Sequence, residues 1–493
     1  MIVDHLPILP VVLPLLAAPF CIILKNRILC WGLISIVSLS CLLISLFIIT
    51  SLVPGTPLIY SIGGWESPVG ISYFIDHLNG VLLFFVCMLT SFLILFFSFS
   101  LDWDISKKNQ YFFYTAFLLC FAGLVGVILT ADAFNAFVFI EISSLATYIL
   151  VALGRDKQSL LASYRYLIFG TIGATFFVLG IGVLYVLTGT LNFQDMAVRL
   201  SENNQVEAQH AAFTLVMVGL FIKASVFPLH AWLPNSYAHA PALATTFFSA
   251  IGTKVFLYLI IRFAFDVFNF GLIIESTFIN TVFFVLAILG IFFGAMAAFF
   301  EKNIKKLFAY SSVSQVGLIL IGISLGTVDG LVAGIIHLIN HGITKGFIFV
   351  IVCYLTFKIG RSTINDFSGI AKAYPISCAG IVLGCFSLIG VPGTPGFITK
   401  FSLISSIIST QNYILAFTVL LLSILSVLYS WRLVEVLYFG NLKQNVTDCE
   451  KWSNLNKKYL ALLIIFCIFM FVLAFDTSFT IDFARIAAEQ LVN

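Results

Sequence analysis

Long apolar stretches separated by short polar segments dominate this chain. Each stretch holds about 20 residues, enough for a helix to cross a hydrocarbon core of about 30 Å. The pattern therefore predicts about fourteen membrane-spanning helices. They are expected at residues 6–24, 28–52, 80–100, 111–131, 133–153, 164–188, 211–229, 240–262, 278–300, 305–325, 329–357, 376–400, 412–436 and 459–475.

The composition agrees with this pattern, because 61% of the residues are hydrophobic and 10% are charged. Soluble domains carry far more charge, so we expect a polytopic, all-α membrane protein. The first apolar run follows a short acidic start and lacks the basic flank and cleavage site of a signal peptide. It is expected to be a retained helix, and residues 1–493 are expected to form a single membrane domain.

Lysine and arginine are distributed unevenly between the two sets of loops. The loops after odd-numbered spans hold most of them, including Lys443 and Lys451, whereas the opposite side has only Arg199, Arg262 and Arg485. Since cytoplasmic loops are enriched in basic residues, both termini are expected on the non-cytoplasmic side. The basic residues are spread over separate loops, which argues against a nucleic-acid partner.

Cofactor motifs are not apparent. The ten cysteines, including Cys449, are never spaced as in metal or iron–sulfur sites, and no phosphate-binding glycine loop ending in Gly-Lys-Ser/Thr occurs. We therefore expect no metal and no cofactor.

Five ionisable residues lie inside predicted spans. They are Glu141, Lys223, Lys254, Lys345 and Lys400. An unpaired charge at the bilayer centre costs several kcal/mol, so charges retained there commonly handle ions or protons.

Two of these lysines lie next to predicted helix breaks. Proline removes a backbone donor and clashes with the preceding turn, so the helix should end soon after Lys223 and be interrupted before Lys400. The residues predicted to make the breaks are Pro228, Pro234, Pro392, Gly393, Pro395 and Gly396. Interrupted helices in corresponding positions of two halves are typical of an ion-handling site. The alternative is that the kinks serve packing alone.

A polar stripe is predicted along the eleventh span. His337, His341 and Lys345 are spaced i, i+4 and i+8, so they share one helical face, with Asn340 beside them. This arrangement favours a water-linked proton relay. Interhelical hydrogen bonding by the histidines is the alternative. A metal site is not favoured, because no carboxylate lies nearby and the lysine would repel a cation.

Glu141 is predicted to pair with Lys223. A neighbouring carboxylate changes a buried lysine's affinity for its proton, so making and breaking the pair would move a proton. Lys254, on the next helix, would receive that proton or pass it toward the eleventh span. A static buried ion pair is the alternative.

Several phrases carry a family resemblance over nearly the whole chain. They are YFIDHLNGVLL, FNAFVFIEISSLATYIL, SYRYLIFGTIGATFFVLGIGVLY, LFIKASVFPLHAWLPNSYAHAPA, FFSAIGTKVFLYLIIR, KLFAYSSVSQVG, HLINHGITKGFIF and GVPGTPGFITKF. With these, the chain resembles the antiporter-like subunits shared by Mrp-type cation/proton antiporters and the membrane arm of respiratory complex I. The sixth- and eighth-span phrases are most similar to the D-subunit branch of the Mrp antiporters.

The resemblance implies a fold of 14 helices in two inverted five-helix repeats, at about 111–262 and 278–436, with helices seven and twelve broken. By matching motifs it gives Glu141 and Lys223 the paired roles. It assigns Lys254, His337, His341 and Lys345 to a central relay and Lys400 to the far exit. Lys400 differs from the glutamate of one complex I branch, and Asn235 replaces an aspartate common after Trp-Leu-Pro.

The expected function is that of a proton-translocating subunit of a multisubunit Na⁺(K⁺)/H⁺ antiporter in a bacterial inner membrane, a transporter subunit and not an enzyme. Its expected partners are the other antiporter subunits, H⁺, Na⁺ or K⁺, and the lipid bilayer. One alternative is a proton-pumping membrane subunit of a complex I-like NADH:quinone oxidoreductase. The other is a non-conducting assembly subunit.

Overall fold

The computed structural model of this protein describes residues 3–269, 277–442 and 456–492. The predicted loop residues Lys443 and Lys451, together with Cys449, lie outside these ranges. The long helices are α1 (Leu9–Leu24), α2 (Arg27–Ser51), α3 (His77–Phe97), α5 (Gln110–Leu129), α6 (Ala133–Ala152), α7 (Gln158–Thr188), α9 (Val206–Ala224), α14 (Thr277–Phe300), α15 (Ile304–Ser324), α16 (Val328–Ile359), α17 (Pro375–Ile389), α18 (Pro395–Ser409), α19 (Tyr413–Phe439), α20 (Lys457–Phe475) and α21 (Ser478–Val492). Shorter helices are α4 (Leu101–Asp104), α8 (Phe193–Glu202), α10 (Leu233–His239), α11 (Ala242–Phe247) and α12 (Thr253–Arg262).

The predicted multi-pass helical architecture is confirmed. Thirteen helices among the described residues are long and apolar enough to cross a membrane, and a fourteenth span results if the bent pair Ile364–Lys372 and Pro375–Ile389 is counted as one. The twelfth span, predicted at 376–400 with a break, is interrupted: α17 ends at Ile389 and α18 begins at Pro395. The predicted end is too early, because α18 continues to Ser409.

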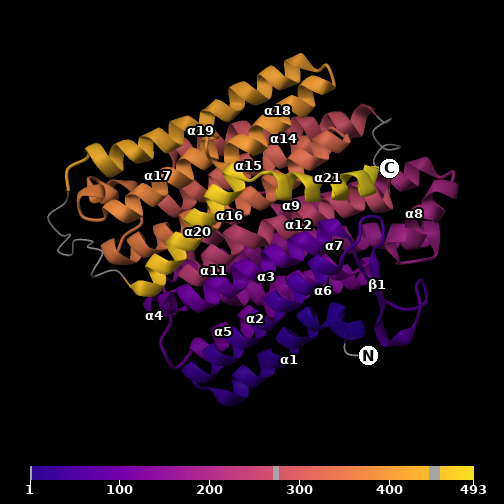
Figure 1. The fold of residues 1–493 in the computed structure, drawn as a ribbon, viewed down its shortest axis with the longest axis horizontal. Helices are drawn as coiled ribbons and strands as arrows, with labels where there is room; N and C mark the ends of the chain where they lie inside the picture. The colour runs from indigo at the N-terminus through magenta and orange to yellow at the C-terminus, as the bar shows by residue number, and fades with distance from the viewer. Residues whose placement is uncertain (1–2, 270–276, 443–455, 493) are drawn as a thin grey trace.

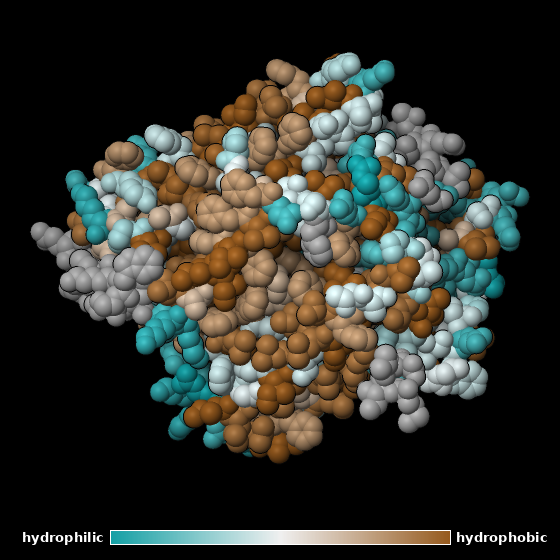
Figure 2. Space-filling model, viewed as in Figure 1, coloured by the Kyte–Doolittle hydropathy of each residue, from teal (hydrophilic) through white to brown (hydrophobic). Residues whose placement is uncertain are grey.

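The long helices lie side by side, with the N-terminal helices on one side of the bundle and α17–α19 on the other (Figure 1). Apolar side chains cover much of the middle of the face in Figure 2, and hydrophilic ones gather toward its two ends. This distribution is the one expected of a bundle whose middle faces hydrocarbon and whose ends face water.

Several elements lie outside the predicted spans, among them a hairpin and two amphipathic helices. Strands β1 (Leu58–Ser61) and β2 (Ser72–Ile75) form an antiparallel hairpin, and α8 occupies a segment expected to be loop. The other amphipathic helix is α21, which follows the last predicted span and packs against α16 and α3. These elements escape a search for 20-residue apolar runs because α8 and α21 are amphipathic and the strands are short.

Two long helices are interrupted where prolines and glycines predicted it. Helix α9 ends at Ala224, one residue after Lys223, and Ser225 adopts a left-handed conformation with φ 60°. Trp232 Nε1 then donates to the carbonyl oxygen of Ile222 at 2.8 Å, which satisfies an acceptor at the end of α9. In the other half, Gly390 at φ 89° ends α17. The inverted five-helix repeats remain a prediction.

The helix that follows the first break is not uniformly α-helical. Helix α12 is bracketed by two wider π-helical turns, Phe248–Gly252 and Phe263–Val267. A π turn interrupts the regular i to i−4 hydrogen bonds and is frequent at functional sites. Lys254 is the second residue of α12 and therefore lies directly beside the first of these turns.

Candidate functional site

Glu141 of α6 and Lys223 of α9 form an ion pair. The Lys223 Nζ lies 3.8 Å from Glu141 Oε1, and it donates a 2.7 Å hydrogen bond to Ser144 Oγ. The Lys223 side chain is 2% exposed, whereas that of Glu141 is 29% exposed. The predicted partners are therefore in contact, and Ser144 is a third member that the sequence did not reveal.

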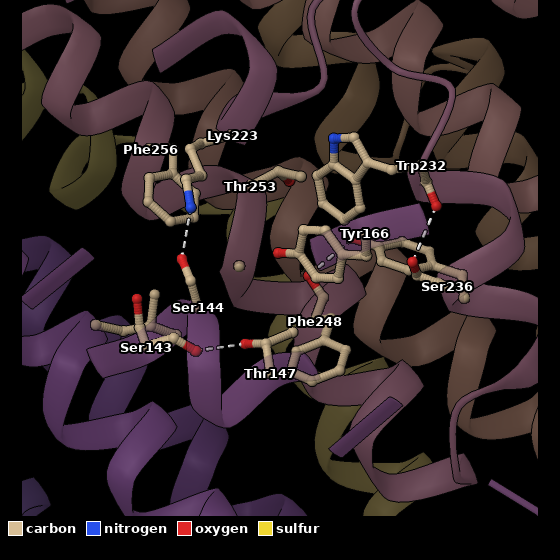
Figure 3. A pocket seen from close by; sticks show the side chains of 13 residues that line it. Ser143, Ser144, Thr147, Tyr166, Lys223, Trp232, Ser236, Phe248, Thr253 and Phe256 are labelled. Carbon is tan, nitrogen blue, oxygen red and sulfur yellow. Dashed lines mark hydrogen bonds between the residues drawn. The ribbon is translucent and has the colours of Figure 1, made fainter. Parts of the chain in front are cut away.

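A cavity lined by many hydroxyl groups lies beside Lys223, which forms part of its wall (Figure 3). The cavity is small, with room for about one or two water molecules. Its polar lining includes Ser143, Thr147, Tyr166, Ser236 and Thr253. Buried hydroxyl groups that converge on a cavity are suitable hydrogen-bond partners for water. The cavity reaches from α6 to the start of α12, toward the next lysine.

Two stacked aromatic rings form part of the cavity wall. The rings of Tyr166 on α7 and Trp232 after the helix break are stacked, with centroids 3.9 Å apart. Trp232 also bonds to the carbonyl oxygen of Ile222, next to Lys223 in sequence. The break in the helix is therefore fixed on both sides, which positions Lys223.

Lys254 lies between the first and second halves of the protein. Its side chain is completely buried, and its Nζ bonds to the carbonyl oxygen of Ser249 within the π turn. Thr253, its neighbour, lines the Lys223 cavity, and α12 packs against α16, the helix that carries His341 and Lys345. Lys254 thus lies on the helix between the two groups of titratable residues.

Helix α16 presents His337, His341 and Lys345 on one buried face, as the helical spacing predicted. The rings of His337 and His341 are parallel, with centroids 6.0 Å apart. Lys345 Nζ donates to the carbonyl oxygen of Phe308 at 2.7 Å and to Ser311 Oγ at 2.5 Å. The three side chains therefore form one stripe along α16. At one end of this stripe the Lys345 ammonium contacts α15.

A second, smaller cavity lies against the histidines. It has room for about one water molecule and is lined by residues of α15, α16, α17 and α18, Asn340 among them. His337 Nδ1 is 2.8 Å from Thr399 Oγ1. Within the described protein, His337 Nε2 and both ring nitrogens of His341 have no hydrogen-bond partner. Buried polar atoms of this kind generally bind water or mark a functional site.

Lys400 lies at the second helix break. Its Nζ donates to the carbonyl oxygens of Leu388 and Ile389 at 2.9 and 2.7 Å, two acceptors that the end of α17 leaves free. A Cβ at Gly390 would lie 2.9 Å from Lys400 Cδ, so glycine serves both the positive φ and the close approach of the lysine.

Arg262 is the last residue of the predicted eighth span, and its side chain is 4% exposed. Its guanidinium contacts Asp76 at 2.5 Å, Asp266 at 2.7 Å and the Tyr258 hydroxyl at 3.1 Å. Arg262 is a span-end residue that finds its buried counter-ion on the N-cap of α3, 186 positions away. Hydropathy alone could not have identified that partner.

The described parts of the chain offer no group of metal ligands. No cluster of three or more histidine, cysteine, aspartate or glutamate side chains there is arranged to hold a metal ion. The buried lysines and histidines of the site instead contact hydroxyl groups and main-chain carbonyls.

The chain has extensive sequence relatives. It is 35% identical over 450 residues to the N subunit of an NADH-quinone oxidoreductase from Desulforudis audaxviator, covering 91% of this chain and 89% of that protein. It is 29% identical over 493 residues to the D subunit of a Na(+)/H(+) antiporter from Bacillus subtilis, covering 99% and 98%.

Solved structures share the fold over the whole length. A chain of the membrane-bound sulfane sulfur reductase, an archaeal respiratory membrane complex, is 29% identical with a TM-score of 0.88, covering 99% of this chain and 98% of that chain. A chain of the Mrp complex from Dietzia sp. DQ12-45-1b has a TM-score of 0.89 at 23% identity, covering 100% and 98%. The family model described as NADH:quinone oxidoreductase/Mrp antiporter, transmembrane region, matches residues 130–426. This protein therefore belongs to the NADH:quinone oxidoreductase/Mrp antiporter transmembrane family.

Proposed function

We propose that this chain is the proton-translocating subunit of a multisubunit antiporter that exchanges Na⁺ or K⁺ for H⁺. The observation that carries the proposal is a buried series of amines and imidazoles across both halves of the bundle. Lys254, Lys345 and Lys400 are each held by a main-chain carbonyl and have no carboxylate ion pair among the described residues. A protein that needed charge only for packing would be expected to neutralise such groups with counter-ions.

The proposed route begins at the Glu141–Lys223 pair. When Glu141 moves away from the ammonium, the electrostatic support for the charged form of Lys223 falls, and the amine can release its proton. The hydroxyl-lined cavity, once hydrated, would carry that proton toward Lys254. Each step changes one buried charge and thereby alters the proton affinity of the next group.

The second half of the route would follow α16 to the break between α17 and α18. The unpartnered ring nitrogens of His337 and His341 face the smaller cavity, and neutral imidazole can accept a proton on one nitrogen and release one from the other. Lys345, on α16, would hold a proton on the ammonium that contacts Phe308 and Ser311 of α15. Lys400 would be the exit, where movement of the interrupted backbone could change its two carbonyl contacts.

The setting we propose is a bacterial inner membrane, with both termini on the non-cytoplasmic side and the basic loops in the cytoplasm. We also propose that the chain works in a complex with other antiporter subunits, because its structural relatives belong to multisubunit membrane complexes. In this role the chain moves ions and catalyses no covalent step.

The 35% identity to a component of an NADH-quinone oxidoreductase supports a second candidate, in which this chain pumps protons and redox centres on other chains supply the energy. A third candidate is an assembly subunit that conducts nothing. All three predict membrane insertion. The first couples proton movement to a cation gradient, the second couples it to a redox reaction, and the third moves no protons.

The experiment is proton flux in vesicles that contain the complete complex. A sodium or potassium gradient should drive proton movement in the native complex, and Lys223→Ala should abolish it while the amount of assembled complex is unchanged. Flux driven by NADH and unresponsive to either cation would favour the second candidate. Undiminished cation-driven flux in assembled complexes carrying Lys223→Ala and Lys400→Ala would favour the third.

A further inference from the structure

Gln315 on α15 is a buried amide that the proposed route does not use. It is 2% exposed, and it lines the small cavity beside His337 and His341. Its Nε2 lies 3.5 Å from the carbonyl oxygen of Leu388, near the end of α17. The ordinary range for such a hydrogen bond is about 2.7–3.2 Å, so this contact is weak. Gln315 therefore reaches from the histidine cavity to the second helix break without holding it tightly.

The carbonyl oxygen of Leu388 is approached by two side-chain donors of the described chain. Lys400 Nζ is 2.9 Å from it and 2.7 Å from the carbonyl oxygen of Ile389, whereas the Gln315 amide stands at 3.5 Å. A charged donor makes a hydrogen bond roughly twice as strong as a neutral donor does. The ammonium therefore holds the Leu388 oxygen, and the amide is the weaker competitor as long as Lys400 is charged.

Another amide shows that this break relies on side-chain donors. Asn340 lines the same cavity and donates to the carbonyl oxygen of Pro395 at 3.2 Å, on the other side of the interruption. Of the two amides, Gln315 is the one that shares its acceptor with a titratable side chain. The hydrogen bond of Gln315 is thus the one that depends on the charge of a neighbour.

We propose that Gln315 is a positioning residue for Lys400, and that its amide takes over the Leu388 carbonyl when Lys400 gives up its proton and turns away. A neutral amine is a weaker donor than an ammonium, so loss of the proton removes the advantage of Lys400 over the amide. With no second donor, the displaced lysine would leave a buried carbonyl without a partner, which is costly. The inference deepens the proposed function, because it rests on Lys400 as the exit of the route.

The exchange of donors would take place at the wall of the histidine cavity, because both Gln315 and Leu388 line it. The amide takes no proton itself, since it does not titrate. It would instead stabilise the arrangement in which the Lys400 amine is released from one of its two carbonyls and can pass or receive a proton. Gln315 thereby links the charge of Lys400 to the cavity that holds His337 and His341.

A double-mutant cycle tests the shared carbonyl. Thermal unfolding of the purified complex is measured for Gln315→Met, for Lys400→Met and for the double variant. Each single variant keeps one donor for the Leu388 oxygen and the double variant keeps neither, so its loss in unfolding temperature should exceed the sum of the two single losses. Gln110→Met, the same change at a fully buried glutamine on α5, is the matched control and should be additive with Lys400→Met. Additive losses for Gln315→Met and Lys400→Met would overturn the proposal.

Proton flux in vesicles tests the positioning role. Gln315→Met should slow cation-driven flux per assembled complex at least about fivefold, because the state with a displaced Lys400 loses its donor. Gln315→His should recover the flux, since the Nε2–H of histidine is as many bonds from the backbone as the amide of glutamine. Native flux with Gln315→Met, or no recovery with Gln315→His, would overturn the positioning role.

The two measurements separate this inference from the proposed function. If a cation gradient drives no proton movement in the native complex, the proposed function fails, and the unfolding cycle still decides whether Gln315 and Lys400 share the carbonyl. If native flux is present but the cycle is additive, the proposed function stands and the role of Gln315 is wrong.

Discussion

The ammonium group of Lys400 donates to the carbonyl oxygen of Ile389, 2.7 Å away, across the interruption between α17 and α18. The lysine therefore replaces the backbone donor that an unbroken helix would have supplied at this point. The same contact gives one side chain two roles, because it satisfies the broken backbone and places a titratable amine at the end of the proposed route.

These two roles of Lys400 can be separated. Lys400→Met should abolish proton flux and also lower stability, because the carbonyl oxygens of Leu388 and Ile389 would lose their donor, at a cost of about 1–3 kcal/mol. Lys400→Gln keeps a donor without a titratable group and should recover stability but not flux. Thermal unfolding and vesicle flux measure the two properties. Normal flux in the glutamine variant would contradict the exit assignment.

The pairing of Glu141 with Lys223 predicts that replacing either residue has the same effect on proton movement. Glu141→Ala and Lys223→Ala should each abolish cation-dependent proton movement, because either change removes the charge that responds to the other. Membrane insertion should be unaffected, as measured by the amount of the chain in the membrane fraction. Glu207→Ala, at the first turn of α9 and away from the pair, is the control. Native exchange in either assembled variant would remove the pair from the mechanism.

His341 should set the rate of transfer along α16. Replacing it with phenylalanine keeps a ring of similar size but removes both unpartnered nitrogens, so flux should slow and its pH profile should change. His210→Phe, in the first turns of α9, should leave both unchanged. Fluorescence measurements of vesicle acidification over a range of pH provide the test. A slower rate with the native pH profile would favour a packing role for His341.

Ser311 is predicted to position Lys345. Lys345 Nζ donates two hydrogen bonds, to Ser311 Oγ and to the carbonyl oxygen of Phe308. Ser311→Ala removes the first, and a hydrogen bond to a charged group is worth about 1.5–3 kcal/mol. We expect slower flux with little loss of assembled complex. Ser312→Ala is a matched control, because that hydroxyl bonds to the same carbonyl but does not contact Lys345. Equal effects of the two substitutions would argue against a positioning role.

Arg262 should matter more for stability than for flux. Arg262→Met leaves Asp76 and Asp266 without their buried partner, which should lower the free energy of unfolding by about 3–5 kcal/mol. Thermal unfolding of the purified complex is the measurement. Arg199→Met, which removes an exposed ion pair with Asp195, should change stability by less than about 1 kcal/mol. Comparable unfolding temperatures for both variants would show that the ion pairs of Arg262 with Asp76 and Asp266 do not stabilise the protein.

The sequence determined the parts of this protein that depend on local pattern. Apolar runs fixed where most helices lie, proline and glycine predicted the interruptions after Lys223 and before Lys400, and the helical period put His337, His341 and Lys345 on one face. These features follow from backbone geometry and hydrophobicity within one segment.

Only the tertiary structure decided which groups meet across distant segments. It brought Lys345 to Ser311, His337 to Thr399 and Arg262 to Asp76. It also left the Glu141 side chain 29% exposed, whereas its partner Lys223 is 2% exposed. Hydropathy cannot distinguish a side chain that faces lipid from one that faces another helix, because both surroundings are apolar, and the difference depends on how the helices pack.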